Sequence, residues 1–302
     1  MVNVLVFGEV LFDIIRGSEY PGGAPFNFVI NLQRLGVNSL FISKIGDDKL
    51  GKRILKLMED NNLSSELMQI DNVYKTGTVD VILNKETSPD YIINKPVAYD
   101  FIQYFGEIDR KLKSIEFDVF YFGTVAQRSG ISRSTLFKIF QNVNSRKNFY
   151  DINLRKNCWN PSIVSESLHH TDILKINDDE IITLSETLYE KKFEEKEIYF
   201  KLKNDYKIQT LCVTKGEKGC TIYENDNATD IDGFKVAISD TVGAGDAFSA
   251  GFVYGISNDL SIVKAAELGN LMGSYVAGHS GAIPKFSIEL KNKIDDLLNN
   301  TI

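Results

Sequence analysis

Residues 240–252 read DTVGAGDAFSAGF and combine a glycine-rich turn, a carboxylate and a run of small apolar residues. Gly243 and Gly245 flank a small Ala244, so the backbone there can bend sharply and approach a ligand closely. The apolar run predicts a buried helix, and the amides at a helix N-terminus favour an anion. Asp246 at that end suits a site that holds a phosphoryl group and accepts a proton from its attacker. The structural alternative for Asp246 is an N-terminal helix cap.

The composition excludes several classes of protein. The 302 residues include 34 basic and 41 acidic ones, giving a net charge of −7, which argues against a nucleic-acid surface and does not indicate an anionic membrane. No apolar run approaches the roughly 20 residues that a membrane helix needs. The three cysteines form no CxxC pair and suit a reducing cytosol. Residues 2–7 have no basic region ahead of them and predict a buried strand rather than a signal peptide, so we expect a cytoplasmic protein.

Strands and helices alternate along most of the chain. Apolar runs predict strands, and helical spacing of apolar residues predicts helices between them. The expected strands are 2–7, 39–45, 117–122, 148–152, 172–176 and 210–214, and the expected helices are 20–36, 47–61, 132–144, 161–168, 178–206, 245–255, 260–277 and 287–299. Such alternation predicts an α/β fold with a doubly wound, mostly parallel sheet and helices on both faces.

Two stretches depart from this alternation. Residues 65–104 have weak helical periodicity and short β-rich pieces at 77–83 and 91–93, which predicts a small β-sheet lid over one face. Residues 218–223 and 229–236 predict an antiparallel sheet edge. We expect a single domain over residues 1–302, with lid strands from about 14–22 and 75–105.

Polar residues follow several of the expected strands. They are Asp13 after the first strand, then Asp151, Asn153 and Arg155, then Asn177 and Glu180, and then Thr214, Lys215 and Gly216. In open parallel sheets the ligand lies beyond the carboxyl ends of the strands. These clusters and residues 240–252 should therefore converge on one crevice.

Two common nucleotide-binding motifs are absent. The GxxxxGK[ST] pattern of a Walker P-loop does not occur, and no GxGxxG follows the first strand, so an NAD enzyme is disfavoured.

Four segments instead resemble the signatures of the PfkB, or ribokinase-like, sugar kinases. Residues 240–248 resemble the family's C-terminal signature, and Gly22-Gly23-Ala24-Pro25-Phe26-Asn27 with Leu35-Gly36 resembles the N-terminal one. Asn177-Asp178-Asp179-Glu180 matches the NxxE motif, and residues 213–219 match the nucleotide loop. All four occur in the family's order. The N-terminal signature and Asp151-x-Asn153-Leu154-Arg155 look most like fructokinases, although the second element also occurs in 2-keto-3-deoxygluconate kinases.

The resemblance implies the roles of the phosphoryl-transfer groups. Asp246 would be the general base, and Gly243, Ala244 and Gly245 would form an anion hole for the transferring phosphoryl oxygens, which suits a reaction that needs positioning and charge neutralisation. Asp13, Gly23 and Asn27 would contact the sugar, since a carboxylate and an amide both bind hydroxyls. Arg155 would lie with the substrate-binding residues and bind a phosphate group through two hydrogen bonds.

The resemblance also implies which residues bind the nucleotide and the metal ions. Asn177, Thr214, Gly216, Gly219 and Asn270 would contact ATP, and Glu180 would organise Mg²⁺ through water, because Mg²⁺ keeps much of its hydration shell. Asp240 and Thr241, with the turn at residues 280–282, would hold a monovalent cation such as K⁺. For Asn177 and Glu180 the structural alternative is a capped helix start.

These inferences predict an ATP-dependent sugar kinase that phosphorylates a ketohexose, most similar to a fructokinase. The open alternatives are a 2-keto-3-deoxygluconate kinase, a ribokinase-type kinase and a non-catalytic sugar or nucleotide sensor on the same fold. An acid sugar would need a cation near Asp13 and Asn27, for which Arg16 is the nearest in sequence. Family members often dimerise through lid sheets, so a homodimer is expected, while only eight residues separate Asp13 from Gly22 and predict an abbreviated first lid strand.

Overall fold

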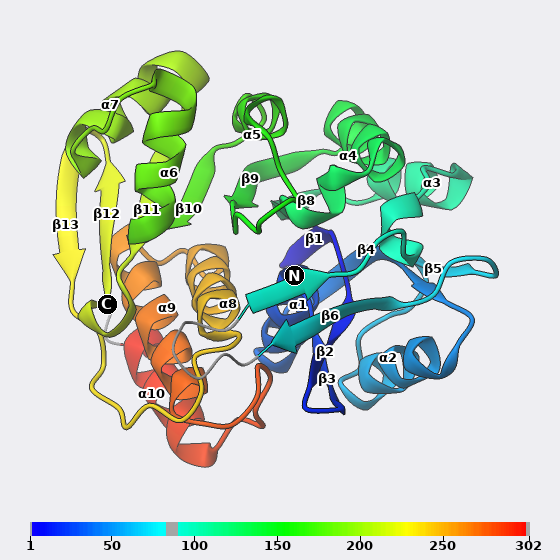
Figure 1. Ribbon diagram of the computed structural model, residues 1–302. Coiled ribbons are helices and arrows are strands. Elements are labelled where there is room, and N and C mark those ends of the chain that lie inside the picture. Colours follow the sequence, from blue (N-terminus) through cyan, green and yellow to red (C-terminus); the bar gives the residue numbers. More distant parts are fainter. Residues whose placement is uncertain (1, 83–89, 300–302) are drawn as a thin grey trace.

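A nine-stranded sheet forms the centre of the computed structural model, which describes residues 2–82 and 90–299 (Figure 1). Its strand order is β13-β12-β11-β10-β9-β8-β1-β4-β5. The strands from β11 to β5 are parallel to their neighbours, and β12 and β13 are antiparallel. Their bounds are β1 (Asn3–Phe7), β4 (Asn38–Gly46), β5 (Met68–Asp71), β8 (Phe117–Gly123), β9 (Ser145–Asp151), β10 (Ile173–Asn177), β11 (Thr210–Thr214), β12 (Cys220–Glu224) and β13 (Asn227–Ile231).

Helices cover both faces of this sheet. Alternate residues of β1 point to opposite faces, so Val4 and Val6 pack in one apolar cluster while Leu5 and Phe7 pack in another. The first cluster includes side chains of α1 (Ala24–Arg34), α2 (Lys49–Asp60), α8 (Ala244–Ser257) and α9 (Ile262–Ala277). The second includes those of α3 (Gly106–Ser114), α4 (Gly130–Asn142), α5 (Pro161–Leu168), α6 (Asp178–Tyr189) and α7 (Glu195–Tyr206). The doubly wound α/β fold is therefore confirmed, with α10 (Ile288–Asn299) packed outside against α9.

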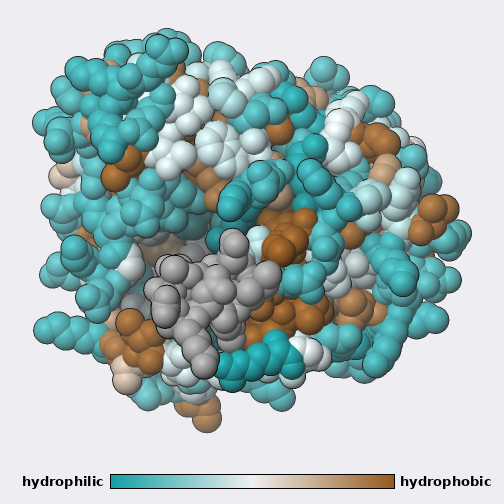
Figure 2. Space-filling view, in the orientation of Figure 1, coloured by the Kyte–Doolittle hydropathy of each residue, from teal (hydrophilic) through white to brown (hydrophobic). Residues whose placement is uncertain are grey.

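A separate sheet of four strands lies in front of the large sheet in Figure 1. The small sheet has the order β3-β2-β6-β7 and consists of β2 (Leu11–Ile15), β3 (Ser18–Gly22), β6 (Gly77–Ile82) and β7 (Asp90–Ile93). Figure 2 shows apolar side chains gathered near the middle of this face. In the small sheet, Tyr20 of β3 and both Tyr91 and Ile92 of β7 are exposed.

The start of the small sheet corrects two expectations. Asp13 lies within β2, not in a turn after β1, so the small sheet begins at Leu11 rather than near residue 14. The predicted abbreviated strand is also wrong, because β2 and β3 have five residues each. They form a hairpin whose turn needs only Arg16 and Gly17, both with positive φ, so the short spacing accommodates two whole strands.

The expected lid range of 75–105 was too long at its C-terminal end. Residues 83–89 of that range lie outside the described residues. After β7 the chain leaves the small sheet, and the 3₁₀-helix Ala98–Phe101 packs against the main core, with Tyr99 fully buried. Phe101 stacks on Tyr74 at a centroid distance of 3.8 Å. Of the aromatic residues in the range, Tyr91 of β7 is exposed on the small sheet, and Phe105 is exposed outside that sheet, just before α3.

Two further expected elements have different bounds. The helix expected over 178–206 is two helices, because Glu190 adopts a left-handed conformation (φ 54°) and Ser185 Oγ closes the turn by bonding the carbonyl of Lys191 and the N–H of Phe193. The strand expected over 229–236 ends at Ile231. It begins early because Asn225 and Asp226 both have positive φ and form a tight hairpin turn.

The strand order reverses at β1. The chain proceeds from β1 to β4 on one side and reaches β8 on the other, so a crevice opens at the carboxyl ends of β1 and β8. Glu9 follows β1 and Val125 follows β8 at this place. Among the described residues, no helix has the length and apolar character needed to cross a bilayer.

Candidate active site

Two adjoining cavities occupy the carboxyl edge of the large sheet. The first, of about 320 Å³, lies between the two sheets, and its wall includes Asp13, Asn27 and Asp246. The second, of about 670 Å³, lies among β11, the loop after β13 and α9. The cavities share four wall residues: Asn177, Thr214, Thr241 and Gly245. A ligand in one cavity can therefore meet a ligand in the other beside Asp246.

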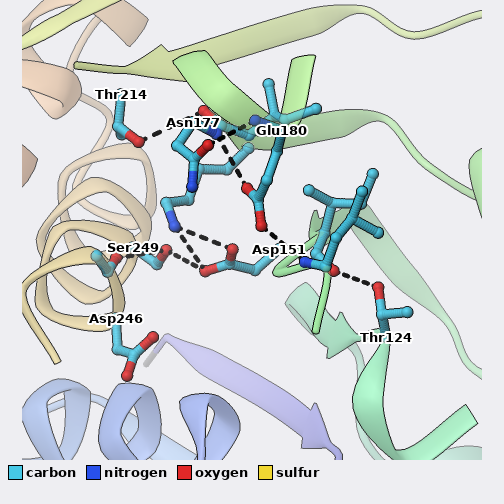
Figure 3. Close-up of polar contacts among 12 residues, drawn as sticks. Thr124, Asp151, Asn177, Glu180, Thr214, Asp246 and Ser249 are labelled. Carbon is cyan, nitrogen blue, oxygen red and sulfur yellow. Dashed lines mark hydrogen bonds and ion pairs between the residues drawn. The ribbon is translucent and has the colours of Figure 1, made fainter. Parts of the chain in front are cut away.

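Asp246 lies in the first turn of α8 and points toward α1 (Figure 3). Its Oδ2 accepts a hydrogen bond of 2.8 Å from Asn27 Nδ2, so the neighbouring helix fixes the carboxylate while Oδ1 stays available. Asp246 makes no side-chain cap for the helix, whose N-cap residue is Gly243. The capping alternative for Asp246 is therefore wrong.

The start of α8 explains the glycines of this segment. Gly243 has φ 79°, and a Cβ there would lie 2.5 Å from Cβ of Ala282. The first helical bond runs from Ala247 N–H to the Gly243 carbonyl, so the N–H groups of Gly245 and Asp246 precede it and lack an acceptor within the helix. Ala244 differs from the expectation, because its N–H bonds the Thr241 carbonyl at 3.2 Å and its side chain faces the second cavity. The geometry favours Gly245 and Asp246 as the anion-binding amides.

The small sheet and α1 together form the far end of the first cavity. Asp13, Gly23 and Asn27 all line it. A Cβ on Gly22 would lie 2.6 Å from Asp13 Oδ2, so glycine leaves room for that carboxylate. Gly23 has φ 101°, and a Cβ there would lie 2.8 Å from the carbonyl oxygen of Glu9. The paired glycines therefore allow β2, β3 and α1 to meet closely around the cavity.

Two carboxyl groups of this cavity, those of Asp246 and Asp13, have pKa values raised to about 6. Burial raises the pKa of Asp246 to about 6, and the charge of Asp151 adds to this, while the Asn27 amide, Lys175 and Arg155 act in the opposite direction. Burial also raises the pKa of Asp13 to about 6, with Arg155 opposing and Asp240 adding to the shift. Both carboxyl groups are therefore mainly ionised at pH 7, and a base with a pKa of this kind is well matched to proton transfer.

Lys175 lies directly beneath the N-terminus of α8 and was missed in the sequence. Its Nζ bonds both carboxylate oxygens of Asp151, at 3.0 and 3.2 Å, and a Cβ on Gly245 would lie 3.2 Å from that Nζ. Burial disfavours the charge of Lys175, but Asp151, Glu180 and Asp246 raise its pKa above the usual value. The first cavity is thus lined by a buried ammonium group that stays charged.

Asp151 itself does not face the ligand, in contrast to the expectation for the strand ends. It is 2% exposed and accepts hydrogen bonds from Ser249 Oγ at 2.8 Å and Tyr121 at 3.2 Å, in addition to Lys175. Figure 3 shows this carboxylate between Ser249 of α8 and Glu180 of α6. Since Ser249 belongs to α8, Asp151 holds β10 and the catalytic helix in a fixed relation.

The loop after β9 brings Arg155 to the first cavity. Asn153 adopts a left-handed conformation (φ 38°) and also lines the cavity, in the crevice where the strand-end clusters were expected to meet. The N–H of Leu154 bonds Glu180 Oε1 at 2.7 Å, which fixes the loop. Arg155 then lies 6.0 Å from the ring centroid of Tyr91 on the small sheet, so it contacts both sides of the cavity. Arg16 lies instead in the β2–β3 turn.

Asn177 and Glu180 form a capping box at the start of α6. Asn177 Oδ1 accepts from the N–H of Glu180 at 2.7 Å, and Glu180 Oε2 accepts from the N–H of Asn177 at 3.1 Å. The structural alternative is therefore present, yet both side chains also line the first cavity. Burial raises the pKa of Glu180, opposed by Lys175.

The residues present fit Mg²⁺ through water rather than by direct coordination. Both oxygens of Glu180 already accept backbone hydrogen bonds. Within residues 2–82 and 90–299, no group of three or more His, Cys, Asp or Glu forms a cage for a metal. A magnesium ion here would rely on water and nucleotide phosphates, as Mg²⁺ commonly does.

The predicted nucleotide residues line the second cavity. Thr214, Gly216, Gly219 and Asn270 all contribute to its wall. Gly219 also has a packing reason, since a Cβ there would lie 2.0 Å from the carbonyl oxygen of Ile231. Asn270 donates to the carbonyls of Ile231 and Asp232 at 3.1 and 3.2 Å, so it holds the loop after β13 against α9.

Asp240 joins two turns near the cavities but lines neither cavity. Its Oδ1 accepts from Val242 N–H at 3.0 Å and its Oδ2 from Gly281 N–H at 3.3 Å, which joins the two turns expected to hold a monovalent cation. Thr241 lines both cavities, and its carbonyl accepts from Ala244.

A buried carboxylate, N–H groups without an acceptor at a helix start and a buried ammonium group lie at the junction of the two cavities, an arrangement that suits an enzyme that transfers a phosphoryl group between two small molecules. Residues 3–289 match the model of the pfkB family carbohydrate kinases, and the chain belongs to that family. It is a carbohydrate kinase, with fructokinases among its relatives.

The relatives cover nearly all of the chain. "Probable fructokinase-6, chloroplastic" of Arabidopsis thaliana is 31% identical over 314 residues, covering 93% of this chain and 79% of the relative. A double-mutant fructokinase of Vibrio cholerae O395 with fructose, ADP and potassium ion bound is 24% identical, with a TM-score of 0.82 and coverage of 99% and 98% of the two chains. An uncharacterized sugar kinase of Pyrococcus horikoshii in complex with ATP is 25% identical, with a TM-score of 0.81 and coverage of 98% and 99%.

Proposed function

We propose that this kinase transfers the γ-phosphoryl group of ATP to the primary hydroxyl of a ketohexose, with fructose as substrate and fructose 6-phosphate as product. The observation that carries the proposal is the polar wall of the first cavity. Asp13, Asn27 and Asp246 present acceptor oxygens around a space between the two sheets, which suits a molecule with several hydroxyl donors. Relatives named as fructokinases support the choice of sugar.

In this mechanism Asp246 is the base. Asn27 holds Oδ2, so Oδ1 takes the proton of the sugar hydroxyl as its oxygen bonds to phosphorus and the bond from phosphorus to the ADP oxygen breaks. The N–H groups of Gly245 and Asp246 and the ammonium group of Lys175 would neutralise charge on the transferring oxygens. Asp13, Gly23 and Asn27 would hold the sugar, and Arg155 would contact the phosphoryl group from the small-sheet side.

The second cavity would bind ATP. Asn177, Thr214 and Gly216 would face the phosphates or ribose, and Gly219 and Asn270 would shape the base end. Bound Mg²⁺, held through water near Glu180, would supply positive charge to the β- and γ-phosphates. The loops joined by Asp240, with Thr241, would bind K⁺ through backbone carbonyls, which the potassium ion in the Vibrio cholerae structure supports. A homodimer through the small sheet and a cytoplasmic location stay predictions.

One observation favours a second substrate. Arg155 lies close enough to Asp13 to influence its pKa, so the cavity holds a cation that could pair with the carboxylate of 2-keto-3-deoxygluconate. We place fructose first because carboxyl and amide oxygens outnumber this cation around the cavity.

A coupled ADP-release assay over a panel of sugars tests the proposal. The panel contains fructose, 2-keto-3-deoxygluconate, ribose and glucose, and NMR of the product locates the phosphate. We expect the highest kcat/KM with fructose and a phosphate on its primary hydroxyl. Highest turnover with another sugar would reject fructose, and saturable sugar binding without turnover of any sugar would indicate a sensor.

A further inference from the structure

Glu9 is a buried carboxyl group at the strand-order reversal, and none of the motifs described above includes it. It lies two residues after the end of β1 and is 3% exposed. It lines the first cavity together with Asp13, Asn27 and Asp246. Acidic side chains are rarely buried to this extent without a partner, so its position calls for a physical reason.

One oxygen of this carboxyl group lacks a partner. The backbone N–H groups of Glu9 itself and of Ala24 bond to the carboxyl, but Oε2 has no hydrogen-bond partner among the described residues. Asn27 Oδ1 is in the same condition, and it lines the same cavity. Buried acceptors without partners carry a substantial desolvation penalty, which a bound hydroxyl would remove.

The electrostatics of Glu9 suit a hydroxyl rather than an anion. Burial raises the pKa of Glu9 to about 7; the two backbone N–H groups and Arg128 oppose the shift, and Asp246 adds to it. The carboxyl group is thus partly protonated near neutral pH and can either donate or accept a hydrogen bond. A sugar hydroxyl can do the same.

The backbone around Glu9 is held tightly. A Cβ on Gly8 would lie 2.3 Å from Pro25 Cγ, and one on Gly23 would lie 2.8 Å from the Glu9 carbonyl oxygen. The segment therefore has little room to move relative to α1, which also carries Asn27. A binding group held in this way loses little conformational entropy when the ligand arrives.

We propose that Glu9 binds a non-reacting hydroxyl of the sugar through Oε2 and helps to determine which sugar the kinase accepts. The proposal rests on the proposed function, in that a sugar occupies the first cavity. Glu9 is then a substrate-binding residue beside Asp13 and Asn27, and it recognises a position on the sugar other than the one that Asp246 deprotonates.

The test is a cycle that combines variants of Glu9 with deoxy sugars. Steady-state kcat/KM is measured for Glu9→Ala, Glu9→Gln and the unaltered kinase, using the best substrate of the sugar panel and its deoxy analogues at each non-reacting position. Glu59→Gln is the control, because it removes one carboxylate from the exposed surface of α2. Thermal unfolding of each variant shows whether it is folded, and the isosteric Glu9→Gln serves if Glu9→Ala is not.

We expect Glu9→Ala to lower kcat/KM about 10- to 100-fold for the full sugar, since a hydrogen bond to a charged or buried group is lost. One deoxy analogue should be equally poor with the unaltered kinase and with Glu9→Ala, and KM for ATP should change less than about twofold. An unchanged kcat/KM in folded Glu9→Ala and Glu9→Gln, or the same factor of loss for every deoxy analogue, would overturn the proposal. If fructose is not turned over, the proposed substrate fails separately, and the cycle is run with the sugar that is.

Discussion

The two cavities that meet beside Asp246 use different kinds of contact. The first is lined by carboxyl and amide side chains, with Glu9 between β1 and β2, Asp13 on β2 and Asn27 on α1. The second is larger and is lined by apolar side chains such as Phe234, Val236 and Ile238 together with several glycines. Directional acceptors suit a small molecule with many hydroxyls, whereas apolar walls and exposed backbone suit a flat base and its phosphates.

This difference implies that the first cavity determines which sugar is bound. The wall of the second cavity is formed largely by backbone at glycines and turns, and these residues follow one another in the sequence in a pattern that can be recognised. The first depends on how side chains from distant segments meet, and a change of one oxygen there changes which sugar fits. We therefore expect substitutions at the junction of the cavities to lower kcat. Substitutions within one cavity should change KM for the substrate bound there and leave KM for the other substrate unchanged.

Asp246→Asn should have the largest effect. It keeps the shape of the side chain and removes the base, so we expect kcat to fall by about 10³-fold or more while the sugar still binds. Stopped-flow measurement of turnover and calorimetric titration of the sugar would check this. Near-normal turnover in the variant would show that another group accepts the proton.

Lys175→Met should have the next largest effect. Removing the ammonium group takes away the charge beneath Gly245 and leaves Asp151 ionised and buried, so we expect kcat to fall about 100-fold with a smaller change in sugar KM. Lys192→Met is the control, because its ammonium group is exposed on the surface. Asp151→Asn combined with Lys175→Met tests for loss of folding, since the double variant has no unpaired charge. Normal kcat in either folded variant would contradict a role for Lys175 in charge neutralisation.

Asn270→Ala should affect the nucleotide side alone. Its two hydrogen bonds hold the loop after β13, so their loss should raise KM for ATP about 10-fold and leave sugar KM unchanged. Asn142→Ala is a matched control, because that amide bonds within α4 on the surface. A raised KM for sugar in Asn270→Ala would mean that the two cavities are not independent.

The smallest expected effect is the change of kcat/KM with pH near neutrality. Burial raises the pKa of Asp246 and of Asp13 to about 6, and only the ionised Asp246 can accept the proton. We expect kcat/KM for the sugar to be nearly constant above pH 7 and to fall as the pH drops through about 6. An acidic limb centred near pH 4, measured in a constant-ionic-strength buffer, would show that Asp246 is not buried in the way described.

Sequence reasoning predicted the parallel sheet and the crevice at the carboxyl ends of its strands, because both depend on local signals. Gly243, Thr214 and Gly216 lie at helix starts or strand ends, where spacing alone indicates an edge of the sheet. The identity of the sugar could not be derived in this way, since Asp13 belongs to a small sheet whose hairpin turn was not recognised in the sequence.

Two residues of the site were missed for a common physical reason. Lys175 lies within an apolar strand, and its role is evident only from its ion pair with Asp151, the residue directly opposite in the neighbouring strand β9. Glu9 follows the first strand, but Asp13 was taken as the acidic residue at that end. An acid or a base within a buried parallel strand needs a partner, and that signal could have indicated Lys175. The position of Glu9 depends on contacts with Pro25 and Gly23 that spacing does not reveal.

The most direct test of the central claim is a competition between fructose and 2-keto-3-deoxygluconate in one reaction mixture. The ratio of the two phosphorylated products at early times gives the ratio of their kcat/KM values. The acceptor-rich wall formed by Glu9, Asp13 and Asn27 predicts that fructose is preferred by about 100-fold or more, since an unpaired anion is disfavoured beside ionised carboxylates. An equal or greater yield of the acid sugar phosphate would contradict the account and assign the substrate carboxylate to Arg155.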